Sequence, residues 1–195
     1  MLRRNFLSLA GAAALLAGCS AESKPAFKSV DITGADYARD FALPDTQGKL
    51  RSVQDFKGKA VIVFFGYTQC PDACPTTLAE IADAKKLLGA DGARVQPVLI
   101  SLDPERDKPD VLKAYVANFG PDFIALRGTP EQTAAVAKDF KVFYRKVPGS
   151  APGSYTLDHS AASYVYDPKG QLRLYVRYGA GPQALADDLR LILKG

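Results

Sequence analysis

Residues 60–74 read AVIVFFGYTQCPDAC, an apolar run that ends at a glycine and is followed by two cysteines. The run itself, residues 60–65, is rich in β-branched and aromatic residues, which is typical of a strand buried on both faces. Pro75 follows the second cysteine, and apolar residues then recur at helical spacing, so a helix is predicted there. Cys70 and Cys74 therefore lie where a central strand passes into a helix N-terminus. α/β sheets place their chemistry at such a position, and a helix N-terminus lowers the pKa of a thiol.

The rest of the chain alternates expected strands with expected helices, which indicates an α/β domain with a mixed central sheet. Residues 41–52 are predicted to form a hairpin with its turn at residues 45–48. Further strands are expected at residues 94–102, 123–126, 141–147, 160–167 and 171–178, a loop at residues 148–154, and further helices near residues 107–119, 129–140 and 185–192. Pro97 predicts that part of its strand lies at an edge or a bulge, and Asp107 is expected to cap the next helix.

The composition is that of a globular protein with one domain. The chain has 195 residues, of which 47% are hydrophobic and 24% are charged. Its formal net charge is +4, and Arg3 and Arg4 in the leader account for two of these charges, so the remainder gives no reason to expect a nucleic-acid ligand. We find no internal repeat, and outside the leader no apolar run is long enough to span a bilayer.

The N-terminal residues have the pattern of a bacterial export signal. Residues 1–18 combine a basic start with an apolar core, and the RRNFL segment at residues 3–7 resembles a twin-arginine signal. The LAGC sequence that ends at Cys19 resembles the lipobox of bacterial lipoproteins, in which this cysteine is lipidated. An ordinary cleaved signal with a chance cysteine is the alternative. We expect residues 1–18 to be a lipoprotein signal peptide, residues 19–36 a flexible tether, and residues 37–195 a domain that is lipid-anchored in the cell envelope and faces the periplasm.

Three residues are candidates for chemistry in the folded domain. The chain has three cysteines, and if Cys19 is lipidated, an internal disulfide can join only Cys70 and Cys74. A bond that closes so short a loop constrains the unfolded chain little, so redox exchange or metal binding is the better interpretation. His159 is the only histidine and precedes an expected strand, but a histidine without a role is an equally good interpretation. Two thiolates and an imidazole suit Cu(I), whereas Zn²⁺ would need a fourth ligand.

Three segments of the chain together resemble the Sco/SenC family. These are GYTQCPDACP at residues 66–75, LISLDPERD at residues 99–107 and DHSAASYVYDPKG at residues 158–170. Members of this family are copper-binding proteins of the thioredoxin superfamily that take part in cytochrome c oxidase assembly. The match runs from Tyr37 to the C-terminus and implies a thioredoxin-like fold, with a mixed central sheet flanked by helices and an N-terminal β-hairpin extension.

The resemblance also implies a site and partners. Cys70 and Cys74 would be the copper-binding and redox thiols, and His159 the third ligand of Cu(I), Cu(II) or both. The copper would be delivered to the binuclear copper site of cytochrome c oxidase subunit II, with other periplasmic copper chaperones and thioredoxin-like reductants as further partners. Asp158 is interpreted as a carboxylate that orients His159 or, equally, as a turn former. Asp103 matches the family pattern, but a role in helix entry suffices for it.

Two other functions compete with copper delivery. A thiol–disulfide reductase would keep the cysteines of the oxidase copper site reduced, with the more exposed Cys70 attacking and Cys74 resolving the mixed disulfide. The residues leave both roles open. A peroxidase of the peroxiredoxin kind fits less well, because it needs a threonine and an arginine beside one activated cysteine, and the local sequence offers Thr68 but no arginine.

Overall fold

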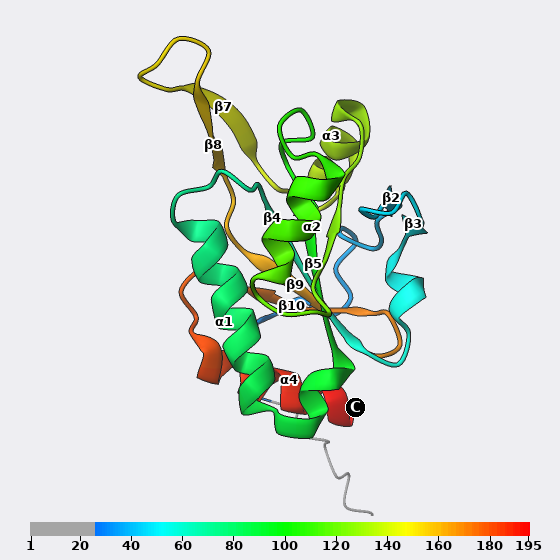
Figure 1. The fold of residues 1–195 in the computed structure, drawn as a ribbon. Helices are drawn as coiled ribbons and strands as arrows, with labels where there is room; N and C mark the ends of the chain where they lie inside the picture. Colours follow the sequence, from blue (N-terminus) through cyan, green and yellow to red (C-terminus); the bar gives the residue numbers. More distant parts are fainter. Residues whose placement is uncertain (1–25) are drawn as a thin grey trace, which may run out of the picture.

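The structure, a computed structural model, describes residues 26–195, and both the predicted signal peptide and Cys19, the predicted lipidation site, lie outside this range. In the described part of the chain a six-stranded sheet forms the centre, in the order β1-β10-β9-β4-β5-β6 (Figure 1). Its strands are β1 Val30–Asp31, β4 Ala60–Gly66, β5 Val95–Ser101, β6 Ile124–Leu126, β9 Ser163–Tyr166 and β10 Leu172–Val176. Strands β4, β5 and β6 are parallel and the other three pair antiparallel, so the sheet is mixed, as predicted.

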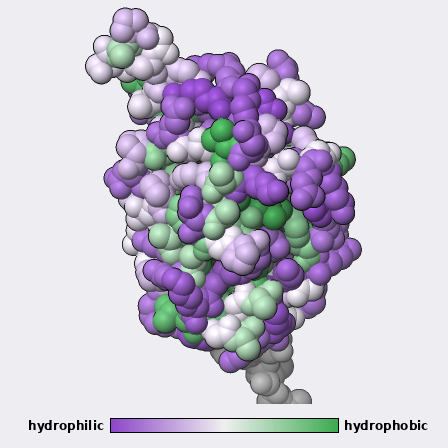
Figure 2. All heavy atoms as spheres, viewed as in Figure 1, coloured by the Kyte–Doolittle hydropathy of each residue, from purple (hydrophilic) through white to green (hydrophobic). Residues whose placement is uncertain are grey.

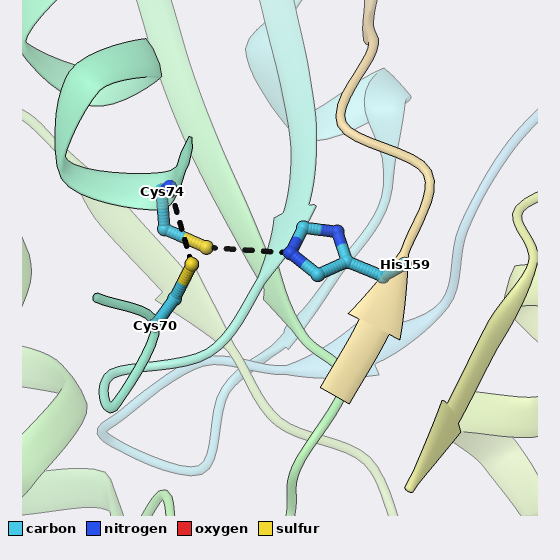
Figure 3. A group of neighbouring side chains, drawn as sticks. All are labelled: Cys70, Cys74 and His159. Atoms are coloured by element: carbon cyan, nitrogen blue, oxygen red, sulfur yellow. Dashed lines mark hydrogen bonds between the residues drawn. The ribbon is translucent and has the colours of Figure 1, made fainter. Parts of the chain in front are cut away.

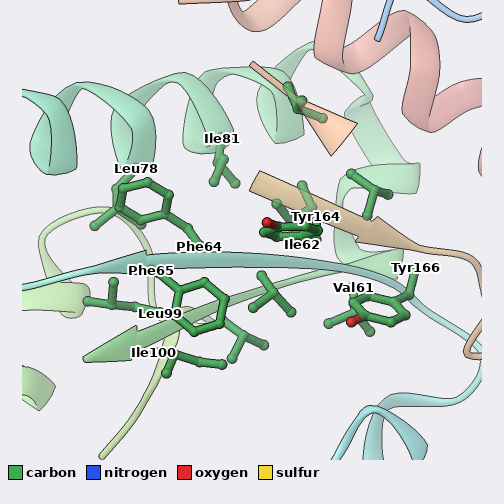
Figure 4. Close-up of a cluster of buried hydrophobic side chains, with 14 of the residues drawn as sticks. Val61, Ile62, Phe64, Phe65, Leu78, Ile81, Leu99, Ile100, Tyr164 and Tyr166 are labelled. Carbon is green, nitrogen blue, oxygen red and sulfur yellow. The ribbon is translucent and has the colours of Figure 1, made fainter. Parts of the chain in front are cut away.

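Helices cover both faces of this sheet. They are α1 Ala73–Leu87, α2 Pro109–Ala117, α3 Pro130–Asp139 and α4 Pro182–Lys194, with short 3₁₀ helices η1 Val53–Phe56 and η2 Gly89–Arg94. On one face Phe64 of β4 points toward Leu78 of α1 (Figure 4), and α4 packs beside α1. On the other face Phe65 packs edge-on against Phe140, which follows α3, at 5.0 Å between ring centroids. Every residue of β4 is buried, which confirms the prediction of a strand buried on both faces.

The predicted N-terminal hairpin is present. Strands β2 Leu43–Pro44 and β3 Leu50–Arg51 pair antiparallel, and the amide of Gly48 donates to the carbonyl of Asp45 at 3.0 Å to close the turn. The Asp45 carboxylate accepts from the amides of Gln47 and Lys49, so the turn carries its own hydrogen bonds.

A second hairpin was predicted only in part: the strand expected at residues 141–147 and the loop at residues 148–154 are present, but the strand that follows the loop was not predicted. Strands β7 Tyr144–Pro148 and β8 Tyr155–His159 form a separate two-stranded sheet that projects from one end of the molecule (Figure 1). His159 precedes β9, the first strand of the closing β9–β10 hairpin, as expected, but it also ends β8, where it pairs with Tyr144. Leu157 is the one buried residue of β8, so this strand lacks the apolar alternation by which strands are recognised.

Two further expectations about local structure can be judged. The prediction that Pro97 lies at an edge is confirmed. Strand β6 pairs only with residues 98–100 of β5, so on this side Pro97 has no partner strand. The prediction that Asp107 caps a helix is wrong, because α2 begins at Pro109 with Lys108 at the N-cap position. Asp107 is instead fully buried beneath the loop that carries the cysteines.

The end of the predicted tether packs on the domain. Val30 of β1 pairs with Tyr175 of β10, and the amides of Lys28 and Ser29 donate to the buried carboxylate of Asp188. The folded part therefore begins before residue 37. Among the described residues no helix is both long and apolar enough to cross a bilayer.

Candidate metal centre

The fold brings together the three residues that the sequence singled out (Figure 3). Cys70 lies in the loop after β4, Cys74 in the first turn of α1, and His159 at the end of β8. The Sγ of Cys74 lies 3.6 Å from Nε2 of His159, and the two sulfurs and one ring nitrogen all lie within 4.8 Å of one another. Two sulfur ligands and one nitrogen ligand thus converge on a volume that one metal ion can fill.

The two thiols differ in burial and in protonation. Cys74 is fully buried and Cys70 half-buried, which agrees with the expectation that Cys70 is the more exposed. The hydrogen bond from the Cys74 thiol strongly lowers the pKa of Cys70, and the backbone amide of Cys74, in the first turn of α1, also donates to the Cys70 sulfur at 3.4 Å. The same thiol hydrogen bond, together with burial, raises the pKa of Cys74. These shifts and the amide hydrogen bond to the Cys70 sulfur favour the thiolate at Cys70 and the protonated thiol at Cys74.

His159 is oriented by the backbone. Its Nδ1 lies 2.9 Å from the carbonyl oxygen of Ser160 and donates its proton there, so Nε2 is the ring nitrogen that faces the sulfurs. Burial lowers the pKa of His159, but its hydrogen bonds to Cys70 and to the Ser160 carbonyl outweigh burial and raise the pKa overall. The interpretation of Asp158 as the group that orients the ring is wrong, since its carboxylate pairs with Arg145 at 3.0 Å.

Aromatic rings enclose the imidazole. Tyr67 and Phe64 both meet the His159 ring edge-on, with centroid distances of 5.9 and 6.3 Å. The Tyr67 hydroxyl accepts a hydrogen bond from the backbone amide of Leu157, two residues before His159. The loop that carries the cysteines is thereby attached directly to the strand that carries the histidine.

A buried carboxylate, that of Asp107, binds the loop between β4 and α1, and the sequence analysis did not predict this role. Asp107 accepts hydrogen bonds from the Thr68 hydroxyl and from the Ser101 hydroxyl, each at 2.6 Å, and from the Thr68 amide at 3.2 Å. Burial raises the pKa of Asp107. No local pattern could have revealed this role, because Thr68 and Asp107 meet only in the folded chain. With its hydroxyl engaged by Asp107, Thr68 is not free to assist Cys70 in peroxidase chemistry.

Residues 29–194 match the model of the SCO1/SenC family. The chain belongs to this family. It is 34% identical over 183 residues to an SCO2-like protein of Rickettsia felis, covering 92% of this chain and 89% of that one. It is 35% identical over 153 residues to the human mitochondrial SCO2 homolog, covering 77% of this chain and 58% of that one.

Solved structures of Sco proteins confirm the predicted thioredoxin-like fold. The structure of Bradyrhizobium japonicum ScoI with copper bound is similar with a TM-score of 0.70 and 38% identity, over 78% of this chain and 97% of that one. Yeast Sco1 with copper bound is similar with a TM-score of 0.72 and 32% identity, over 80% of this chain and 87% of that one. The resemblance to the Sco/SenC family that the sequence motifs indicated is therefore confirmed.

Proposed function

We propose that this protein binds copper through Cys70, Cys74 and His159 and delivers it to the binuclear copper site of cytochrome c oxidase subunit II. The observation that carries the proposal is the convergence of two sulfurs and Nε2 within 4.8 Å. This ligand set suits Cu(I) and tolerates Cu(II). Two similar Sco structures were solved with copper bound, and another Sco protein is described as a member of a family of cytochrome c oxidase assembly proteins.

Delivery would proceed by ligand exchange. A thiolate or imidazole of the recipient replaces one ligand at a time, so that copper is never released to solvent. The half-buried Cys70 is the ligand through which exchange begins, because the Cys74 sulfur lies deeper. Oxidation of both thiols to a disulfide, with a partner disulfide accepting the two electrons and both protons, would remove two ligands and couple loading to redox state.

The setting of this chemistry is also part of the proposal. Lipidation of Cys19 would hold the domain on the membrane, facing the periplasm. Other periplasmic copper chaperones would supply the metal, and thioredoxin-like reductants would restore the thiols. The lipobox-like sequence that ends at Cys19 supports the anchor.

A thiol–disulfide reductase is the second candidate, and the state of the two thiols favours it. An accessible thiolate at Cys70 with a protonated thiol at Cys74 behind it is the arrangement of an attacking and a resolving cysteine. Such a protein would reduce the cysteines of the oxidase copper site without carrying the metal.

Titration of the reduced protein with Cu(I) and Cu(II), beside a His159→Ala variant, separates the two functions. A chaperone should retain one copper per chain, show thiolate-to-copper charge-transfer absorption with Cu(II), and lose tight binding in the variant. A reductase should reduce protein disulfides equally well with and without His159. Wild-type protein that retains no copper and shows no charge-transfer absorption would overturn the proposal.

A further inference from the structure

One arginine joins the two segments that carry the metal-site residues. Arg106 lies in the loop between β5 and α2, and its Nη1 donates to Oε1 of Gln69 at 3.0 Å, next to Cys70. The same nitrogen donates to the backbone carbonyl of Tyr155 at 2.8 Å. Tyr155 begins β8, the strand that ends at His159. No local sequence pattern indicates this link, because Arg106 is distant in the chain from both segments.

Further contacts fix the guanidinium in place. Its central carbon lies 3.6 Å from the centroid of the Tyr155 ring, a close cation–π contact, and 5.7 Å from that of Tyr67. Nε of Arg106 pairs with the carboxylate of Asp103, which is 2% exposed, and the Tyr155 hydroxyl donates to the other oxygen of that carboxylate at 2.8 Å. The Asp103 carboxylate therefore binds both the Arg106 guanidinium and the Tyr155 hydroxyl, while the guanidinium also contacts the Tyr155 ring.

The hairpin that carries His159 depends on such attachments. It is a two-stranded sheet of its own, and a structure of this kind is marginally stable without outside support. The loop at its tip stands clear of the rest of the molecule (Figure 2). Along β8, Arg106 holds Tyr155 at one end, the Tyr67 hydroxyl holds the amide of Leu157 in the middle, and His159 reaches the thiols at the other end.

We propose that Arg106 is a positioning residue that holds the β7–β8 hairpin against the dithiol loop, the segment of residues 67–72 between β4 and α1. By holding the hairpin there, Arg106 sets how fast copper leaves the site. When the hairpin moves away, Nε2 of His159 leaves the two sulfurs, and the apparent affinity falls with the fraction of time that all three ligands are together. The positioning of the hairpin is a property of the metal-free protein. The effect on copper release rests on the proposed function.

Amide hydrogen exchange in the reduced, metal-free protein tests the positioning directly. Arg106→Gln should speed exchange of the β8 amides by roughly tenfold, the effect of losing charge-assisted hydrogen bonds, and leave exchange in β4 and α1 unchanged. Arg145→Gln is the matched control, because Arg145 lies on the same hairpin but pairs with Asp158 at the exposed surface. Equal exchange of β8 in the two variants would overturn the proposal.

Two more variants separate geometry from charge and from folding. Arg106→Lys keeps the charge but not the planar fork, so β8 should exchange nearly as fast as in Arg106→Gln. Full protection in the lysine variant would show that charge alone suffices and would overturn the proposed geometry. If Arg106→Gln does not fold, Tyr155→Leu removes the ring contact and the bond to Asp103 while keeping the backbone carbonyl, and β8 should again exchange faster. Unchanged exchange in Tyr155→Leu would count against the proposal.

Transfer of copper from the loaded protein to a Cu(I) chelator tests the proposed effect of Arg106 on the rate of copper release. Arg106→Gln should release copper roughly tenfold faster than either the wild type or Arg145→Gln, because it loses the hydrogen bonds that Arg106 makes to Gln69 and Tyr155. Its Cu(II) charge-transfer spectrum should shift toward that of His159→Ala. If wild type holds no copper, the proposed function fails while the exchange result stands. If wild type holds copper and the two arginine variants release it equally fast, the inference about Arg106 fails alone.

Discussion

The sulfur of Cys74 packs directly against the backbone of Gly66, the last residue of β4. A Cβ atom at Gly66 would lie 2.7 Å from the Cys74 Sγ and 2.8 Å from the Phe64 ring, closer than carbon atoms approach either group in folded proteins. Both neighbours are fully buried, so one of these core side chains would have to shift to admit a Cβ atom. The position of the inner thiol is therefore set by the absence of a side chain at the end of the central strand.

Gly66→Ala should consequently displace the Cys74 sulfur and weaken the metal site. We expect lower copper affinity and a loss of roughly 1–3 kcal/mol of unfolding free energy, which is typical of overpacking a core. Urea denaturation in a double-mutant cycle with Cys74→Ala checks the cause, because the penalty should shrink when the sulfur is absent. Strictly additive effects of the two substitutions would show that the sulfur is not the obstacle.

Asp107→Asn should weaken the attachment of the dithiol loop to the rest of the domain, because Thr68 of this loop binds the Asp107 carboxylate. Three donors, the amide and hydroxyl of Thr68 and the hydroxyl of Ser101, point at the Asp107 carboxylate, and an amide nitrogen placed there cannot accept from them. The expected cost is about 1–3 kcal/mol of unfolding free energy, the range for leaving buried partners unsatisfied. Asp110→Asn, an exposed position in the first turn of α2, is the control for losing a carboxylate. Chemical denaturation that gives equal stability for the two variants would contradict this role for Asp107.

The ionisation of Cys70 should be visible in its rate of alkylation. Its pKa is lowered below the ordinary thiol value, so the fraction of thiolate stays high as the pH falls from 9 to 6, where an unshifted thiol loses about tenfold in rate per unit. We expect iodoacetamide to modify Cys70 at a nearly constant rate over this range in the reduced, metal-free protein. Cys74, whose pKa is raised and whose sulfur is buried, should react only on unfolding.

Mass spectrometry after timed quenching distinguishes the two cysteines. Cys74→Ala removes the thiol hydrogen bond that is the main cause of the low pKa of Cys70, so in this variant the alkylation rate should fall with decreasing pH. A tenfold fall per pH unit in the unsubstituted protein would contradict the assignment of Cys70 as the thiolate.

The parts of the site that local patterns determine were predictable from the sequence. The apolar run of β4, the loop with its two thiols and the proline in the first turn of α1 lie next to one another in the chain, so strand, loop and helix could be placed together. The helix expected near residues 129–140 and the turn at residues 45–48 are likewise local, and both are present. For His159 the residues alone left a ligand and a histidine without a role equally open, because spacing does not place it near the thiols, and the family resemblance implied that it is the third ligand.

The parts that depend on tertiary contacts were not predictable. Strand β8 is mostly exposed and is held by Arg106 and Tyr67 rather than by an apolar face, so its composition does not mark it as a strand. Asp107 precedes a helix, where an aspartate usually caps, but the hydroxyls of Thr68 and Ser101 lie close enough to bind its carboxylate instead. In each case a distant polar group decided the outcome, and such groups leave no periodic signal in the sequence.

Asp188→Ala should release the N-terminal segment from the domain. The Asp188 carboxylate is fully buried on α4 and accepts hydrogen bonds from the amides of Lys28 and Ser29 at 2.6 and 2.8 Å, just before β1 joins the sheet. Hydrogen bonds to a charged group contribute roughly 1.5–3 kcal/mol, so without them the short strand β1 should separate from β10 far more often. Limited proteolysis should then cut near residues 26–31 while the rest of the domain resists, and Asp187→Ala, which removes a partly exposed carboxylate paired with Arg190, should leave the cleavage pattern unchanged. Equal resistance of this segment in both variants would show that the pairing of β1 with β10 holds it without help from Asp188.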